Sequence, residues 1–329
     1  MSPPELRIGV IGFGTVGRSF IDAFAQRRLA LEHAARRRLT LAEVAVREPR
    51  AGDCTIAGAR VHNDAASLAR NPNIDIVVEV SGATEAGDWI VTALDRGAAV
   101  VTANKRALAT HGTLLASLAQ RRSGLYCEAS VAAAVPIVRA LRDSLEGEDI
   151  RAIRGVLNGT TTHILSAIEA GHSFVGALAD ARRQGICEGD AKLDLSGSDA
   201  AHKLAILCTL AWSAPFECDR VSVDGIGIAI EETVRHSAAR GTRVRLVASA
   251  TRRDGVVTAR VHPATLHADD PLAAATGVAN VVEVETALAG TLRWTGPGAG
   301  GPATASALLA DTLAAARWLA PSRVHRAAA

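Results

Sequence analysis

The lysines stand out among the residues that could do chemistry, because this chain is otherwise basic through arginine. It contains 36 lysine and arginine residues, and only three are lysines: Lys105, Lys192 and Lys203. Arginine keeps its proton at ordinary pH, whereas a lysine ammonium can be tuned to release it. A lysine retained in such a chain is therefore a candidate for proton transfer, although chance explains any single one.

Lys203 ends the acidic block GICEGDAKLDLSGSDAAHK (185–203), which also contains Glu188, Asp194 and Asp199. Asp199 and Lys203 are four residues apart in a predicted helix and therefore share one face. That spacing is equally typical of a solvent-exposed ion pair worth little energy. Carboxylates beside a lysine can instead hold a substrate ammonium group while the lysine transfers a proton.

The segment GFGTVG (12–17) matches the glycine pattern of a dinucleotide-binding turn. Gly12 would allow the tight turn, Gly14 the approach of a pyrophosphate, and Gly17 close packing of helix and strand. An ordinary glycine turn is the alternative, but this one follows a predicted strand and opens a predicted helix, whose first amides would bind phosphate. The candidate cofactor residues here are Gly12, Gly14, Thr15, Val16 and Gly17.

The choice of cofactor depends on the end of the second predicted strand, VAVREPR (44–50). An acidic residue there would bind a ribose hydroxyl, whereas an arginine suits a 2′-phosphate. Arg47 favours NADP, and Glu48 keeps NAD open. A solvated loop is the alternative for the arginine.

Lys105 directly follows the fourth predicted strand, in VVTANKRAL (100–108). Ligands of open parallel sheets bind beyond the carboxyl ends of the strands. Lys105 is therefore expected where cofactor and substrate meet, with a surface lysine as the alternative.

The segment LNGTTTH (157–163) forms a predicted turn leading into a helix. Asn158 or Thr160 could cap that helix and do nothing else. A substrate carboxylate at the start of the helix is the functional alternative.

These residues need a scaffold, and the hydrophobic pattern predicts one of the α/β class. Four apolar runs (6–12, 39–46, 74–82 and 98–104) alternate with helical patterns and predict a Rossmann-type parallel sheet with helices on both faces. A further strand is expected over 125–130. Beyond about residue 130 a helical pattern over 136–145 and further helices mix with alternating segments over 244–265 that predict two antiparallel strands joined by a turn. This mixture predicts a second, α+β domain. The segment GPGAGG (296–301) predicts a glycine turn leading into a final helix.

Composition narrows the function classes. Hydrophobic residues make up 48% of the chain and the net charge is +2, so nothing indicates a nucleic-acid or membrane partner. Five scattered cysteines without CxxC spacing favour reduced thiols. The N-terminus runs straight into a strand, leaving no room for a signal peptide, and we expect a cytoplasmic protein.

Taken together, these motifs resemble those of homoserine dehydrogenases over nearly the whole chain. The motifs are GFGTVG, VVTANK, EASV (128–131), LNGTT (157–161), the acidic block ending at Lys203, and GPGAGG (296–301). The resemblance implies reversible NAD(P)-dependent interconversion of L-homoserine and L-aspartate 4-semialdehyde, on the route to threonine and methionine. It also implies a homodimer that pairs through the second domain. The implied domains are 1–130 with 304–329 for the dinucleotide and 131–303 for substrate and dimerisation.

The resemblance also assigns roles to residues of this chain. Lys203 and Asp199 match the catalytic pair, with Lys203 as proton shuttle, and Lys105 matches a second active-site lysine. The implied substrate-binding residues are Glu188, Asp194 and Thr160. The implied ligands of a monovalent cation such as Na⁺ or K⁺ are Glu128, Val131 and Ala133.

The sequence departs from the family pattern at three places. Residues 132–134 are alanines where glycines are usual, Ala191 replaces a proline, and Thr162 replaces an asparagine. Because alanine does not easily take a positive φ, the loop and its cation site are in question. These departures keep open a dehydrogenase for another hydroxy amino acid, and a non-catalytic dinucleotide sensor is a third hypothesis. The chain has no segment resembling the C-terminal regulatory ACT domain of many relatives, so no feedback through one is expected.

Overall fold

The computed structural model describes residues 5–48, 55–120, 123–187 and 191–319. The chain divides into two compact units, residues 1–130 with 301–329, and residues 131–300. The second unit is thus an insertion in the first.

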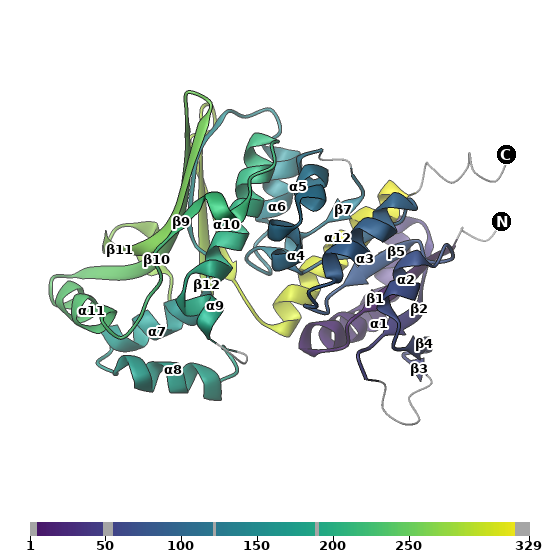
Figure 1. Ribbon diagram of the computed structural model, residues 1–329, viewed down its shortest axis with the longest axis horizontal. Helices are drawn as coiled ribbons and strands as arrows, with labels where there is room; N and C mark the ends of the chain where they lie inside the picture. The colour runs from purple at the N-terminus through teal and green to yellow at the C-terminus, as the bar shows by residue number, and fades with distance from the viewer. Residues whose placement is uncertain (1–4, 49–54, 121–122, 188–190, 320–329) are drawn as a thin grey trace. The chain divides into compact units, whose positions relative to one another are not determined.

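The first unit is built on a seven-stranded sheet with the order β3-β4-β2-β1-β5-β6-β7 (Figure 1). Its strands are β1 (Glu5–Ile11), β2 (Arg38–Ala45), β3 (Thr55–Ile56), β4 (Ala59–His62), β5 (Ile76–Glu79), β6 (Ala99–Thr102) and β7 (Leu125–Tyr126). All neighbours are parallel except β3 and β4. Because the chain leaves β1 first toward β2 and later toward β5, the strand order reverses at β1, where such sheets bind ligands.

Strands β5 and β6 of this sheet are mostly apolar and are buried along their whole length. No residue of β5 (IVVE) or β6 (AVVT) is exposed, as expected for parallel strands covered on both faces. The helices are α1 (Thr15–Ala35), α2 (Ala65–Arg70), α3 (Ala86–Asp95), α4 (Lys105–Thr110), α5 (Gly112–Ala119) and α12 (Gly301–Trp318). Phe20 and Phe24 of α1 share one buried cluster with Leu308 of α12, so the last helix completes the core begun by the first.

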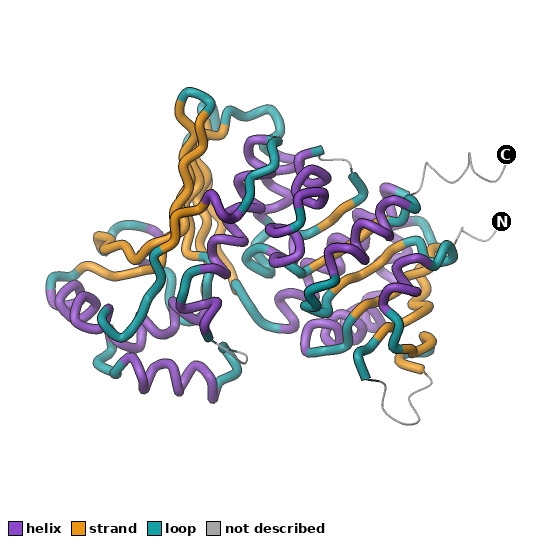
Figure 2. Tube along the Cα trace, in the orientation of Figure 1, coloured by secondary structure: helices purple, strands orange, loops and turns teal. Residues whose placement is uncertain are grey.

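The second unit contains a six-stranded sheet with the order β13-β12-β8-β10-β11-β9. Its strands are β8 (Ile150–Val156), β9 (Val221–Val223), β10 (Thr242–Arg253), β11 (Val256–His267), β12 (Ala279–Thr286) and β13 (Thr291–Pro297). Only β9 and β11 are parallel. The predicted hairpin over 244–265 is confirmed as the long pair β10–β11, whose strands Figure 2 shows in orange.

The helices of the second unit include the one that carries Lys203. They are α6 (Ile137–Arg139), η2 (Ala140–Ser144), α7 (Gly159–Glu169), α8 (Phe174–Arg183), α9 (Lys192–Leu195), α10 (Ser198–Trp212), η3 (Cys218–Arg220), α11 (Ile230–Ala239) and η4 (Pro271–Ala274). The fully buried Arg245 of β10 donates to Glu169 at 2.6 Å and to the carbonyls of Ala273 and Ala275. The hydrogen bonds of Arg245 compensate for the burial of its charge. Its bonds to Glu169 also hold the end of α7 against the sheet.

Two predicted elements are confirmed only in part. The strand predicted over 125–130 ends at Tyr126, and Glu128–Ser130 form the short 3-10 helix η1 instead. The Glu128 amide donates to the Asp311 carboxylate of α12 at 2.8 Å, so it is not available to a strand ladder. The helix predicted over 136–145 splits into α6 and the π-helical turn η2.

Within the ranges given above, no helix combines the length and the apolar character needed to cross a membrane.

Candidate active site

The glycine turn between β1 and α1 leaves no room for side chains at two positions. Gly12 has a φ of +107°, and a Cβ there would lie 2.7 Å from the Cα of Ser81. A Cβ on Gly17 would lie 2.3 Å from the Gly12 carbonyl oxygen. Gly14, the N-cap of α1, faces open space instead. The turn therefore has the geometry expected for these roles, with Gly12 at a tight bend, Gly17 in close packing and open space beside Gly14.

A cavity of about 1180 Å³ lies beyond the carboxyl ends of β1, β2 and β5. Its lining residues include Gly12, Gly14, Arg18, Arg47, Ser81, Gly82, Ala83, Glu85 and Trp89. Thr15, Val16 and Gly17 form the first turn of α1, where backbone amides have no acceptor within the helix. A glycine cradle, a helix start and a cavity of this size fit a bound dinucleotide.

Positively and negatively charged side chains both line this cavity. Arg47 and Glu48 are exposed at the end of β2, and Glu85 lines the same space. Hydrogen bonds from its own backbone amide and from Thr84 lower the pKa of Glu85, and the charge of Arg47 lowers it further. Arg47 therefore lies at the cavity just beyond the end of β2, the position that the sequence predicted.

Lys105 stands one strand further along the same edge of the sheet, as the first residue of α4 after β6. The Asn104 side chain caps this helix by accepting the Ala107 amide at 3.0 Å. Lys105 is half-buried and is not one of the residues that line the cavity. Its place beyond the carboxyl end of a strand is the one predicted.

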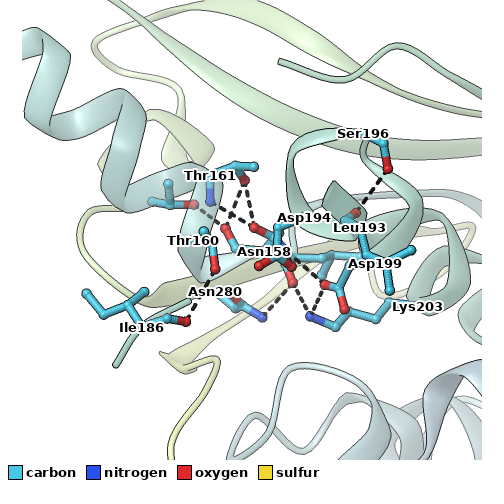
Figure 3. A network of polar contacts seen from close by, with 12 residues as sticks. Asn158, Thr160, Thr161, Ile186, Leu193, Asp194, Ser196, Asp199, Lys203 and Asn280 are labelled. Carbon is cyan, nitrogen blue, oxygen red and sulfur yellow. Dashed lines mark hydrogen bonds and ion pairs between the residues drawn. The ribbon is translucent and has the colours of Figure 1, made fainter. Parts of the chain in front are cut away.

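Two residues of the acidic block, Asp199 and Lys203, are buried in the second unit. Lys203 Nζ lies 2.7 Å from Asp199 Oδ2 and donates to the Leu157 carbonyl at 2.6 Å (Figure 3). Both side chains come from α10, and both residues are only 7% exposed. The alternative of a solvated surface pair is therefore excluded, and the two groups interact in a medium of low dielectric constant.

Asn158 joins the two aspartates of this cluster. Its Oδ1 accepts the Thr161 amide and so caps α7, as predicted. Its Nδ2 donates to Asp194 at 2.8 Å and to Asp199 at 2.9 Å (Figure 3). Beyond the residue type, nothing in the sequence marked this second role; an amide side chain accepts with its oxygen and donates with its NH₂ group.

Thr160 and Asn280 complete the surroundings of the pair. Thr160, in the first turn of α7, is buried and donates to the Ile186 carbonyl at 3.3 Å. Asn280 of β12 is fully buried and donates to the Leu157 carbonyl at 3.3 Å, so it shares this acceptor with Lys203. No local pattern pointed to Asn280. The predicted substrate ligand Glu188 lies outside the described residues.

A glycine of the GPGAGG segment makes room for Asn280. A Cβ on Gly298 would lie 2.1 Å from the Asn280 amide group. This motif, which the sequence linked only to a turn, thus supports the carbonyl that holds Lys203.

The alanines that replace glycines after Val131 keep a left-handed backbone. Ala132 has a φ of +56° and Ala133 of +45°, and both residues are buried. Alanine was expected to take a positive φ only at a cost, and both residues take it, with strain of about 1–2 kcal/mol per residue. Glu128, in η1, is buried as well. No three His, Cys, Asp or Glu side chains gather as metal ligands in the part of the chain that the structure describes.

The other two departures leave the backbone course intact. Ala191 has a φ of −63°, the value that a proline ring imposes. Thr162 is buried and donates to the Asn158 carbonyl at 2.8 Å. Neither substitution removes a group of the Lys203 cluster.

Three features define a dinucleotide-dependent oxidoreductase. They are a parallel sheet whose strand order reverses at β1, a glycine turn facing a large cavity, and a buried lysine–aspartate pair. Family models agree: the model described as homoserine dehydrogenase, NAD binding domain, matches residues 12–128, and the model described as homoserine dehydrogenase matches residues 136–313. The chain belongs to the homoserine dehydrogenase family, whose members act on a CH–OH group.

Relatives and solved structures are similar over most of the chain. The homoserine dehydrogenase of Pseudomonas aeruginosa is 33% identical over 98% of this chain and 74% of its own length. That of Corynebacterium glutamicum is 37% identical over 97% of this chain and 72% of its own length. A homoserine dehydrogenase structure from Thiobacillus denitrificans superposes with a TM-score of 0.90 at 32% identity, covering 98% of this chain and 75% of that one. A hyperthermophilic archaeal homoserine dehydrogenase mutant in complex with NADPH gives a TM-score of 0.78 at 30% identity, covering 94% and 97%.

Proposed function

We propose that this chain interconverts L-homoserine and L-aspartate 4-semialdehyde with Lys203 as the group that accepts the proton of the substrate hydroxyl. The observation that carries this proposal is the buried position of Nζ, fixed by Asp199 at 2.7 Å and by the Leu157 carbonyl at 2.6 Å. A lysine held by two acceptors in the interior keeps one orientation, as proton transfer in a defined geometry requires. When bound, the nicotinamide supplies the acceptor for the hydride.

The substrate amino group is assigned to Asp194, which shares the Asn158 amide with Asp199. Asp194 is held by the Asn158 amide at 2.8 Å and is only partly exposed, which supports a role as a fixed anionic partner. Glu188 and Thr160 are proposed to contact the substrate as well, and Lys105 is proposed as a second active-site lysine. An ammonium group suits such carboxylates because charge-assisted hydrogen bonds are about twice as strong as neutral ones.

NADP is the proposed cofactor, since Arg47 offers a cation for a 2′-phosphate at the cavity. The archaeal relative in complex with NADPH supports this choice. Glu128 with the backbone carbonyls of Val131 and Ala133 is proposed to hold a monovalent cation. The left-handed backbone found at 132 and 133 supports this, because the loop follows the course that glycines would give it. We further propose a homodimer that pairs through the second unit.

The proton role is tested by Lys203→Ala and Lys203→Arg against the wild-type protein, with L-homoserine and either NADP⁺ or NAD⁺. Loss of a general base lowers kcat by about 10²–10⁴-fold, and arginine restores the charge but not proton transfer. Both variants should therefore lose turnover while retaining NADPH affinity. Lys192→Ala is the matched control, because Lys192 lies in the same acidic block but is exposed on α9. Wild-type turnover in Lys203→Arg would contradict the assignment.

A further inference from the structure

The carboxylate of Glu79 is fully buried at the carboxyl edge of the first unit's sheet, and the proposed function does not use it. Glu79 is the last residue of β5 and is 0% exposed. Burying a carboxylate is expensive unless hydrogen bonds replace water. Burial raises the pKa of Glu79, and hydrogen bonds from Ser81, Thr102 and Asn104 counteract that rise.

The two oxygens of Glu79 bind two different loops. Oε1 accepts the Ser81 amide at 2.8 Å and the Ser81 hydroxyl at 2.6 Å. Oε2 accepts the Thr102 hydroxyl at 2.9 Å. Ser81 belongs to the loop after β5, and Thr102 ends β6. A single side chain therefore connects the ends of two neighbouring strands.

The Ser81 side of this network shapes the cofactor cavity. The Ser81 hydroxyl accepts the Ala83 amide at 3.1 Å, and residues 81–83 all line the cavity. Gly12 packs against the Ser81 backbone, so closely that a Cβ would lie 2.7 Å from its Cα. The position of Ser81 thus fixes the distance between the glycine turn and the facing loop.

The Thr102 side of the network leads to Lys105. The Thr102 hydroxyl accepts the Asn104 amide at 3.0 Å, and the Asn104 side chain caps α4, whose first residue is Lys105. The Asn104 amide group also lies 3.5 Å from the Ala83 carbonyl, which links the two loops a second time.

We infer that Glu79 is a positioning residue that sets the cofactor loop and Lys105 in register with each other. The inference rests on the proposed function, because it gives Lys105 a part in the reaction. A carboxylate suits this position because it is an acceptor only, with two oxygens. Glutamine presents an NH₂ group to one of the two loops: on the Ser81 side it meets a backbone N–H that already points inward, and on the Thr102 side it leaves the hydroxyl proton without its acceptor. It can therefore satisfy one side of the network but not both.

Separate variants test the two sides. Thr102→Val cuts the link to Lys105, and Ser81→Ala removes the hydroxyl that holds the cavity loop. Loss of one hydrogen bond of this kind corresponds to about a five- to tenfold change. We expect Thr102→Val to lower kcat by that factor with NADPH affinity unchanged, and Ser81→Ala to weaken NADPH affinity with kcat at saturating cofactor unchanged. Glu79→Gln should reproduce one of these effects, and Glu79→Ala both.

Asp75→Asn provides the matched control. Asp75 is a buried carboxylate directly before the same strand, at its opposite end, and accepts the Arg7 amide at 2.8 Å. Its loss should lower the melting temperature and leave kcat and NADPH affinity unchanged, as a purely structural role predicts. The inference is overturned if Glu79→Gln and Thr102→Val have wild-type constants, or if their defects only follow the loss of folded protein. If the wild-type protein does not turn over L-homoserine, the proposed function fails, and the NADPH affinities of Ser81→Ala and Glu79→Ala still decide this inference.

Discussion

The left-handed alanines allow a direct measurement of backbone strain. A glycine at position 132 or 133 removes about 1–2 kcal/mol of strain, because both residues have positive φ. The same change loosens the unfolded chain, which costs about 0.5–1 kcal/mol, and removes a buried methyl group, which costs about 0.8 kcal/mol. The terms nearly cancel. Ala132→Gly and Ala133→Gly should therefore change the free energy of unfolding by less than about 1 kcal/mol.

Ala140→Gly is the matched control for this prediction. Ala140 is also buried and lies in the same unit, but its φ is −57°, so a glycine there relieves no strain. It should be destabilising by about 1.5 kcal/mol from the entropy and methyl terms alone.

Urea-induced unfolding followed by circular dichroism measures the stability of all three variants. Because the three positions lie in one unit, their free energies of unfolding can be compared on the transition of that unit, without assuming that the whole chain unfolds in one step. If Ala132→Gly and Ala133→Gly were both as destabilising as Ala140→Gly, the left-handed backbone would not exist in solution.

Three further changes test other parts of the structure. Gly298→Ala should displace Asn280, whose amide group occupies the place of the new methyl, and so lower kcat about tenfold in steady-state assays with L-homoserine; wild-type kcat would refute the supporting role. Partial burial alone would raise the pKa of Asp270, but hydrogen bonds from Arg154 and a backbone amide outweigh it and lower the pKa from its ordinary value of 3.8. A depressed carboxyl pKa contributes stability above the unfolded value and loses it as pH falls through the folded value. Asp270→Asn should thus be about 0.5–1 kcal/mol less stable near neutral pH and equal to wild type in strong acid, which a pH series of thermal melts checks. Arg47→Ser should raise KM for NADP⁺ about tenfold or more and leave KM for NAD⁺ nearly unchanged, and an unaltered ratio of the two would exclude Arg47 as the 2′-phosphate ligand.

The sequence predicted the first unit well because its signals are local. A continuous apolar strand, a glycine turn and an amphipathic helix follow one another within residues 6–24, and the structure confirms them as β1 and α1. The short strands β3 and β4 of the first unit and β9, β12 and β13 of the second were missed. β12 takes its place in the sheet by pairing with β8, about 130 residues earlier, and β13 is an edge strand with alternate residues exposed. Such pairings depend on tertiary contacts rather than on a pattern within the strand.

The residues of the polar cluster around Lys203 also divide into features that the local sequence predicts and features that depend on tertiary packing. The spacing of Asp199 and Lys203 correctly placed them on one helical face, and the pattern around Asn158 correctly predicted a cap. Their burial, however, depends on how α10 and α7 pack against the sheet. Asn280 reaches the Leu157 carbonyl only through the register of β12, so no neighbouring residue in the sequence could have marked it.

The packing of α12 against α1 has a consequence for the order in which the chain folds. During synthesis β1 and α1 emerge first. Phe20 and Phe24, however, cannot pack with Leu308 until all of residues 131–300 have been made. The inserted unit is continuous in sequence and can complete its own contacts before the helix that closes the first unit appears. Domains usually fold in the order of synthesis. Here the nucleotide-binding unit begins first and finishes last, because the part of its core that α12 covers is completed only when α12 is made.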